Sequence, residues 1–229
     1  RHLMKNILAT GGCGFIGSHF VRYLLKKYKN IKVVNVDLLT YAGNIENLRD
    51  IEKDKRYRFY KNDIGDFYAM DRILKKEKPD AIINFAAESD NNKATQSPID
   101  FAKTNSYGTA VLLEAARKNR IKRFHHISTC EVFGQLSLNS KERFREISPF
   151  RPRTPYNATK ASADLIVKSY YHTFDMPITI SHCCNNYGSH QFPEKVIPVF
   201  IINALKNRPL PVFKSSKNKR EWIHVLDHC

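Results

Sequence analysis

The chain has 229 residues, of which 42% are hydrophobic, 26% charged and 11% aromatic, a composition that is typical of a folded α/β domain and excludes a disordered chain. It contains no run of about 18 to 20 apolar residues, which excludes an integral membrane protein. The formal net charge is +16, but the basic residues fall in short groups at expected helix ends and loops, so we expect a solvated surface that attracts an anionic substrate and does not bind nucleic acid.

Short apolar segments alternate with helical patterns along the chain. Strands are expected at Asn6–Thr10, Lys32–Val36, Tyr57–Tyr60, Ala81–Phe85, Phe124–Ile127 and Ile178–His182. Helices, in which apolar residues recur three and four positions apart, are expected at Phe15–Tyr28, Phe67–Lys76, Pro98–Lys118 and Pro155–Phe174. Because strands that alternate with helices pair in parallel through right-handed crossovers, the pattern predicts an α/β fold with a doubly wound parallel sheet, the Rossmann fold.

The pattern changes after about residue 190, where prolines break the chain into short pieces. We expect residues 4–190 to form a nucleotide-binding domain and residues 191–229 to begin a small C-terminal substrate domain that is incomplete here. The residues before Met4 lead almost at once into the first strand, without the charged and apolar regions of a secretory signal.

The cysteines point to a reducing compartment. Five occur, at Cys13, Cys130, Cys183, Cys184 and Cys229. Their number is odd, and neither a CxxC pair nor a histidine spacing that suits zinc is present. We therefore expect no disulfide framework, no metal site and a cytoplasmic protein.

The first strand runs into a glycine-rich turn that opens the first helix. Gly11, Gly14 and Gly17 permit a tight turn, close approach of the backbone to a pyrophosphate, and close packing of the helix on the strand. The helix N-terminus adds free N–H groups and a favourable dipole. Asp37, at the end of the second strand, suits the ribose hydroxyls of NAD and would repel the extra phosphate of NADP. The turn therefore predicts an NAD site.

Tyr156 and Lys160 lie one turn apart near the start of a helix that Pro155 opens, so they share a helix face. An ammonium beside a phenol favours the phenolate, so we expect Lys160 to lower the pKa of Tyr156 and to make it a base near neutral pH. Ser128 and Thr129 end the fifth strand, where a doubly wound sheet forms its ligand crevice.

With these residues the sequence resembles the extended short-chain dehydrogenase/reductases, and among them most closely the dTDP-glucose 4,6-dehydratases. The matching segments span almost the whole chain: Thr10–Gly17, Val36–Asn44, Ala86–Ser89, His125–Thr129, Glu131–Val132, Tyr156–Lys160, Asn185–Gly188 and Phe192–Lys195. The resemblance implies a lyase that acts on a nucleotide-activated hexose through an internal redox cycle with tightly held NAD.

The resemblance also implies a role for each catalytic residue. Tyr156, assisted by Lys160 and Thr129, would take the proton from the sugar 4-hydroxyl while C4 gives a hydride to NAD. Glu131 would remove the C5 proton of the resulting ketone. Water would then leave C6 with the help of an acid, and the hydride would return to C6 to give the 4-keto-6-deoxy sugar.

Binding residues follow from the resemblance in the same way. Those implied for NAD are Gly11, Gly14, Phe15, Ile16, Gly17, Asp37, Leu38, Thr40, Asp63, Ile64, Phe85, Ala86, Ala87, Thr104, Tyr156, Lys160 and Asn186. Those implied for the sugar nucleotide are Ser89, Thr129, Asn185, Lys195, Phe213 and Arg220, with Arg220 placed for the phosphates. The family's quaternary pattern implies a homodimer through the helices Pro98–Lys118 and Pro155–Phe174.

The chain departs from the family at the residue expected to protonate the leaving hydroxyl. The family's triplet is Thr-Asp-Glu, whereas this chain has Thr129, Cys130 and Glu131. A thiol is protonated at neutral pH and can donate, so Cys130 is a candidate substitute acid. The other interpretations are that hydride returns to a different carbon, that elimination is lost, or that Cys130 is a small apolar filler without a chemical role.

Further departures, at Asp90–Lys93, His182, Cys184 and Phe213–Ser216, bear on the preferred nucleotide base. We expect His182 to be a packed histidine at a strand end. The hypotheses that compete with a dehydratase are an NDP-sugar 4-epimerase, a 5,6-dehydratase, a non-catalytic NAD-binding scaffold and a basic polyanion-binding module.

Overall fold

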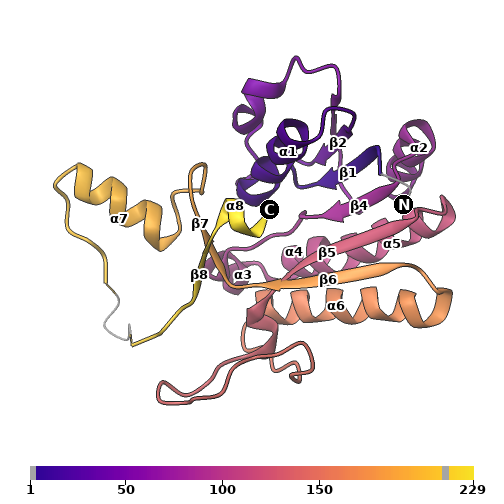
Figure 1. Ribbon diagram of the computed structural model, residues 1–229. Coiled ribbons are helices and arrows are strands. Elements are labelled where there is room, and N and C mark those ends of the chain that lie inside the picture. The colour runs from indigo at the N-terminus through magenta and orange to yellow at the C-terminus, as the bar shows by residue number, and fades with distance from the viewer. Residues whose placement is uncertain (1–3, 213–216) are drawn as a thin grey trace.

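The computed structural model describes residues 4–212 and 217–229 (Figure 1). Six parallel strands form one sheet in the order β3-β2-β1-β4-β5-β6. They are β1 Asn6–Thr10, β2 Lys32–Asp37, β3 Tyr57–Lys61, β4 Ala81–Asn84, β5 Arg123–Thr129 and β6 Ile178–Cys183. The predicted Rossmann sheet is confirmed. Its strand order reverses between the neighbours β1 and β4, and a ligand crevice forms at the carboxyl ends of such strands.

Helices cover both faces of the sheet (Figure 1). The helix α1 Phe15–Lys27 and the 3₁₀ helix η1 Ile45–Ile51 pack on one face, whereas α2 Phe67–Glu77, α5 Thr109–Lys118 and α6 Pro155–Phe174 pack on the other. Both ends of α2 are capped by residues of its own segment. The Asp66 side chain accepts from Ala69 N at the N-cap, and Lys78 ends the helix in the left-handed conformation. The predicted helices near α1, α2 and α6 are therefore confirmed, whereas η1 was not predicted.

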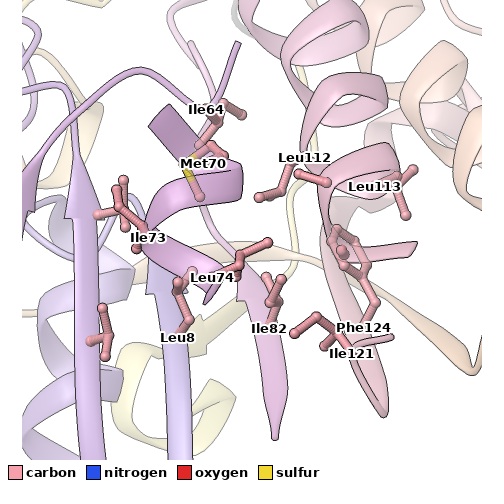
Figure 2. Packing of buried hydrophobic residues seen from close by; sticks show 14 of the residues in the cluster. Leu8, Ile64, Met70, Ile73, Leu74, Ile82, Leu112, Leu113, Ile121 and Phe124 are labelled. Atoms are coloured by element: carbon pink, nitrogen blue, oxygen red, sulfur yellow. The ribbon is translucent and has the colours of Figure 1, made fainter. Parts of the chain in front are cut away.

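Alternate residues of each strand supply the two cores. Figure 2 shows Leu8, Ile82 and Phe124, from three adjacent strands, facing residues of α2 and α5 such as Leu74 and Leu112. All five side chains are at most 1% exposed. Burying a side chain of this size stabilises the fold by about 1.5–3 kcal/mol. Both faces are packed, so the strand ends are held rigidly enough to position a site.

The segment predicted as one helix, Pro98–Lys118, is helical throughout but contains a π turn. It consists of α4 Pro98–Phe101, the π-helical turn η2 Ala102–Gly108 and α5. The wider turn brings Asn105 inward, where its amide donates to Glu88 O and Thr159 Oγ1, both at 3.0 Å. The predicted helix is confirmed over its whole length. The apolar periodicity does not distinguish a π turn from a regular α-helix, so the π turn was not predicted.

The C-terminal segment folds back onto the domain, where its last helix contacts the first. Strand β7 Asn185–Tyr187 pairs in parallel with β8 Trp222–His224, and α8 Val225–His228 packs against α1. The helix α7 Val196–Leu205 projects from the body and has no buried residue (Figure 1). Short helices α3 Asn91–Gln96 and η3 Cys130–Phe133 complete the described fold. The division at residue 190 falls between β7 and β8 and stays a prediction.

None of the helices in the described ranges combines the length and the hydropathy that a membrane crossing needs.

Candidate functional site

A cleft of about 450 Å³ opens at the carboxyl ends of the sheet strands. Most of the predicted site residues line it: Gly11, Gly14, Phe15, Ile16, Gly17, Asp37, Leu38, Thr40, Asp63, Ile64, Phe85, Ala86, Ala87, Ser89, Thr104, Thr129, Glu131, Tyr156, Lys160, Asn185, Asn186 and Lys195. Cys130 and Arg220 are not among the lining residues. Phe213 lies outside the described residues. The fold thus brings together residues that are up to about 185 positions apart in the chain.

The glycine turn is packed so tightly that two of its positions exclude any side chain. Gly11 has φ +66°, and a Cβ atom there would lie 2.7 Å from Ala86 N. A Cβ atom on Gly17 would lie 2.3 Å from Gly11 O. These two glycines therefore allow the turn to pack closely on the segment after β4 and on its own helix. A Cβ atom on Gly14 would meet only Gly11 O, at 3.2 Å, which leaves that position open to close approach by a ligand.

The first turn of α1 presents unpaired N–H groups to the cleft. The first intrahelical hydrogen bond runs from Ser18 N to Gly14 O at 3.0 Å, so the amides of Phe15, Ile16 and Gly17 precede it. Gly14 at the N-cap supplies no side-chain acceptor, and no acidic residue lies in this turn. These N–H groups and the helix dipole favour binding of a phosphate group at the N-terminus of α1.

Asp37 connects the glycine turn to the loop that follows β2. One carboxylate oxygen accepts from Cys13 N and the other from Leu39 N, both at 2.8 Å. Burial raises the pKa of Asp37, and these two backbone hydrogen bonds act against the rise. Since a carboxylate has about four acceptor sites, Asp37 retains capacity for ligand hydroxyls.

Two further loops close the wall of the cleft. After β3, Asp63 Oδ1 accepts from Gly65 N at 2.8 Å, which fixes the turn before α2. After β4, Asn105 accepts from Glu88 N at 2.9 Å and donates back to Glu88 O. The residues present therefore fit a dinucleotide: a glycine turn that admits no side chain at Gly11 or Gly17, free helix amides for a pyrophosphate, and an acidic group at the end of the second strand.

Tyr156 stands at the start of α6 beside the end of β5. Burial raises the pKa of Tyr156 well above its usual range, as do the nearby Glu131 and Cys183, whereas a hydrogen bond with Thr129 acts in the opposite direction. The phenol is therefore neutral in this site.

The expectation that Lys160 lowers the pKa of Tyr156 is wrong for the structure as described. Lys160 is 3% exposed, and its Nζ donates to Ile127 O at 2.7 Å and lies 3.3 Å from His126 Nε2. The amine thus lies against β5, and burial lowers the pKa of Lys160 to about 8. The shared helix face could not predict the contacts of the Lys160 amine, because the long side chain reaches residues of β5.

Glu131 enters the cleft from the turn after β5. Thr129 caps this turn, with its hydroxyl accepting from Glu131 N at 3.3 Å. The Glu131 carboxylate accepts from Asn91 Nδ2 at 3.5 Å, and Asn91 Oδ1 in turn accepts from the Thr154 hydroxyl at 2.8 Å. The sequence interpretation named Asn91 only within the departing segment Asp90–Lys93 and not as a site residue. Asn91 supplies a polar neighbour to this carboxylate.

Cys130 does not line the cleft, but it adjoins residues that do, Glu131, Cys183 and Tyr156. It packs against a small apolar cluster that includes Val132, Phe133 and Ala161. Burial raises the pKa of Cys130 to about 11, with further contributions from Glu131 and the neighbouring thiols. The thiol is therefore protonated at neutral pH, and its packing resembles that of a small apolar side chain.

Several lining residues were missed by the sequence interpretation, among them Asn91, Cys183, Gln191, Phe192, Glu194 and Trp222. They cluster at the outer end of the cleft, where Lys195 Nζ donates to Ser89 O at 3.1 Å and pairs with Glu194 at 3.3 Å. The polar and aromatic residues in and around the matched segment Phe192–Lys195 could have indicated these lining residues. Arg220, by contrast, is exposed and donates to the carbonyl of Lys219.

Comparisons with known proteins agree with this geometry. A family model described as GDP-mannose 4,6 dehydratase matches residues 8–229. A dTDP-glucose 4,6-dehydratase from Neisseria gonorrhoeae is 46% identical over 234 residues, which cover 98% of this chain and 67% of the relative. The chain thus spans about two thirds of the length of this relative.

Two solved structures are similar in fold. A dTDP-glucose 4,6-dehydratase from Streptomyces venezuelae, with NAD and TYD bound, superposes with a TM-score of 0.92 at 43% identity and covers 98% of this chain and 69% of its own. A UDP-glucose 4-epimerase from Thermotoga maritima, with UDP-glucose, gives a TM-score of 0.88 at 30% identity, covering 97% and 70%.

Proposed function

Because this chain belongs to the GDP-mannose 4,6 dehydratase family of the extended short-chain dehydrogenase/reductases, we propose that it is an NAD-dependent nucleotide-sugar 4,6-dehydratase, a hydro-lyase. Its substrate is dTDP-glucose or a related NDP-hexose, and its product is the 4-keto-6-deoxy sugar. The observation that carries the proposal is one cleft in which a phenol, an ammonium and a carboxylate, from Tyr156, Lys160 and Glu131, adjoin the glycine cradle.

The cofactor is held by this chain's own turns. The amides of the first turn of α1 receive the pyrophosphate, and Asp37 accepts from the ribose hydroxyls. When bound, NAD supplies the hydride acceptor for sugar C4, the hydride donor for C6, and the positive charge of its oxidised ring. Asp63, Ile64 and Thr104 also line the cleft.

The chain's side chains move the protons. In its phenolate form, which the positive charge of the oxidised NAD ring would favour, Tyr156 would take the proton of the sugar 4-hydroxyl, with the Thr129 hydroxyl as its hydrogen-bond partner. Glu131, oriented by Thr129 and Asn91, removes the C5 proton that the C4 ketone acidifies. The C6 hydroxyl then leaves as water with a proton drawn from solvent, the hydride taken from C4 returns to C6, and Glu131 returns a proton to C5. The sugar keeps its C4 carbonyl, so the proton that Tyr156 took passes to solvent.

Substrate contacts are assigned to the outer end of the cleft. Ser89, Asn185 and Lys195 line it, and Lys195 brings a positive charge toward the diphosphate. Arg220 and Phe213 are proposed as further contacts of the nucleotide.

The test is product analysis with the full-length protein, NAD, and either dTDP-glucose or UDP-glucose. We expect loss of one water from the sugar nucleotide and the alkaline absorbance of a 4-keto-6-deoxy product. Turnover without loss of water from either substrate would overturn the dehydratase assignment.

A second candidate function, an NDP-sugar 4-epimerase, is favoured by the position of Cys130. Since this thiol packs into the cluster with Val132 and Phe133, no side chain at position 130 lines the cleft to protonate a C6 hydroxyl. A C4-epimeric product with all its oxygen atoms would support this alternative.

The quaternary state and the compartment are also proposals. Ile99, Tyr107 and Leu165, on α4, η2 and α6, are 80%, 58% and 58% exposed, which suits a homodimer through these helices. The five cysteines are free, which suits the reducing cytoplasm. Light scattering of the full-length protein tests the dimer, and Leu165→Lys should weaken it.

A further inference from the structure

A buried asparagine interrupts the apolar sequence of β2 and lies against the glycine turn. Strands inside a parallel sheet are apolar on both faces, and Asn35 stands between Val34 and Val36. Asn35 is 0% exposed and pairs in register with Ala9 of β1. A buried amide is costly unless it is hydrogen-bonded, so the partners of Asn35 account for its place in the core.

The side chain of Asn35 bonds to the turn with its carbonyl oxygen. Asn35 Oδ1 accepts from Gly12 N at 3.0 Å. Its Nδ2 donates to Tyr57 Oη at 2.9 Å and to Cys13 Sγ at 3.3 Å. Since a backbone N–H can only donate, Oδ1 and not Nδ2 must face Gly12, which fixes the orientation of the amide. Gly12 has room for this bond because it lacks a Cβ atom, which would collide with Asn35 Oδ1.

A second buried amide, from η1, holds the next residue of the turn. Asn47 is 9% exposed, and its Nδ2 donates to Cys13 O at 2.9 Å. The same carbonyl accepts from Asn44 N at 3.1 Å. Asn35 and Asn47 are not among the residues that line the cleft. Any effect of these two amides on a ligand in the cleft therefore acts through the backbone of the turn.

The first four amides of the turn all donate to groups of the protein. The acceptors are Val36 O for Gly11, Asn35 Oδ1 for Gly12, Asp37 Oδ2 for Cys13 and Gly11 O for Gly14. The amides left to receive an anion are therefore those of the first turn of α1. Because α1 follows the turn directly, the direction of these amides depends on how the turn is held.

We propose that Asn35 and Asn47 are positioning residues for NAD. Asn35 holds the N–H of Gly12 and Asn47 holds the carbonyl of Cys13, so that the turn enters α1 with the free amides of its first residues at the cleft. The inference rests on the proposed function only for the identity of the ligand. Neither asparagine takes part in a proton or hydride step.

Loss of either amide weakens NAD binding without removing a contact to NAD. Without the Asn35 carbonyl, the N–H of Gly12 is buried and has no acceptor, which destabilises this form of the turn. The N–H regains a partner when the peptide rotates toward the open cleft, and this rotation displaces the amides that follow. NAD requires the original turn, so its affinity falls.

The experiment is a calorimetric titration of NAD into the NAD-free full-length protein and its variants. Asn35→Leu keeps the approximate size of the side chain and removes the amide, and we expect it to raise the Kd for NAD about tenfold. The matched control is Tyr57→Phe, which removes a hydrogen bond of the same asparagine but leaves the bond to Gly12. Its Kd should stay within about twofold of the wild-type value. An unchanged Kd in Asn35→Leu, or an equal rise in both variants, would overturn the proposal.

Amide hydrogen exchange in the NAD-free protein gives a readout that needs no ligand. Gly12 lies outside the helices and strands, yet its N–H should exchange slowly in the wild type because Asn35 accepts from it. In Asn35→Leu this exchange should be about tenfold faster, whereas that of Val34, within β2, should be unchanged. Equal acceleration at both amides, or none at Gly12, contradicts the proposal.

A second variant covers the case in which Asn35→Leu does not fold. Asn47→Leu removes one of the two donors to Cys13 O and should raise the Kd for NAD about three- to tenfold. An unchanged Kd there would also count against the proposal. None of these measurements uses a sugar nucleotide. A protein that shows these changes in NAD binding but eliminates no water would refute the dehydratase assignment and leave the positioning role intact.

Discussion

The carbonyl oxygen of Gly11 lies 2.3 Å from the position that a Cβ atom on Gly17 would occupy. This close approach joins the glycine turn to the first turn of its helix through backbone atoms, which cannot move aside as a side chain could. The shape of the NAD cradle therefore depends on the absence of one methyl group.

Gly17→Ala is expected to weaken NAD binding at least tenfold, because the turn must open to admit the methyl group. Isothermal titration of the NAD-free protein with NAD measures the change. Leu112→Ala is the matched control: it removes volume from the core, at a cost of about 2–5 kcal/mol of stability, without touching the cleft. If the two variants bind NAD alike below their unfolding temperatures, the cradle is not the NAD site.

Tyr156→Phe should reduce turnover by about 10²- to 10⁴-fold, the usual contribution of a positioned acid or base, and leave the Kd for NAD within about threefold. The ring and its contact with Phe101 are kept, so the fold is undisturbed. Steady-state kinetics measure the turnover rate, and titration with NAD measures the Kd. Near-wild-type kcat would remove Tyr156 from the chemistry.

The lowered pKa of the buried Lys160 amine predicts how the stability of the fold changes with pH. Its pKa of about 8 in the folded protein lies below its ordinary value of 10.5, so between these pH values the unfolded state binds more protons and the contribution to folding stability rises with pH. Lys160→Met lacks this change. The free energy of unfolding of wild type relative to Lys160→Met should therefore increase by roughly 3 kcal/mol from pH 7.5 to pH 10.5. Urea unfolding at both pH values checks it, and a constant difference would show a normally titrating lysine.

Much of the fold could be predicted from the sequence because it is expressed in local patterns. The apolar strands, the glycine turn and the Tyr156–Lys160 spacing are all short-range signals, and they place these residues at one end of the sheet. The pairing of β7 with β8 and the hydrogen bonds between Asn105 and Glu88 were not predicted. Both join segments that are distant or irregular, and no periodicity marks them.

The electrostatics of the site were the least predictable part. The sequence places Lys160 one turn from Tyr156, but the direction of its side chain depends on the carbonyl of Ile127, which lies on β5 and is distant in the chain. Likewise, the role of Cys130 depends on what its thiol contacts, which the sequence does not show. In the structure, it packs against the apolar cluster with Val132, Phe133 and Ala161.

Asn91→Leu is expected to slow removal of the C5 proton about three- to tenfold, because Glu131 loses its amide donor and the Thr154 hydroxyl loses its acceptor. The rate of solvent-deuterium incorporation at C5 measures this step directly. Asn91→Gln, which can restore the amide contact, should recover part of the rate. Equal rates in all three proteins would show that Asn91 does not orient the carboxylate.

Cys130→Ala should leave loss of water within about twofold of the wild-type rate, because the thiol packs with Val132 and Phe133 rather than lining the cleft. Mass spectrometry of the product over time provides the rate. A drop of a hundredfold or more with the fold intact would instead identify Cys130 as the acid that protonates the leaving hydroxyl.

The most direct test of the internal redox cycle follows a label on the sugar. The full-length protein is incubated with NAD and dTDP-glucose that carries deuterium at C4, and the product is examined by mass spectrometry and NMR. A 4,6-dehydratase loses one water and transfers the deuterium to C6. A product that keeps its water and its C4 deuterium, with or without inversion at C4, would contradict the account.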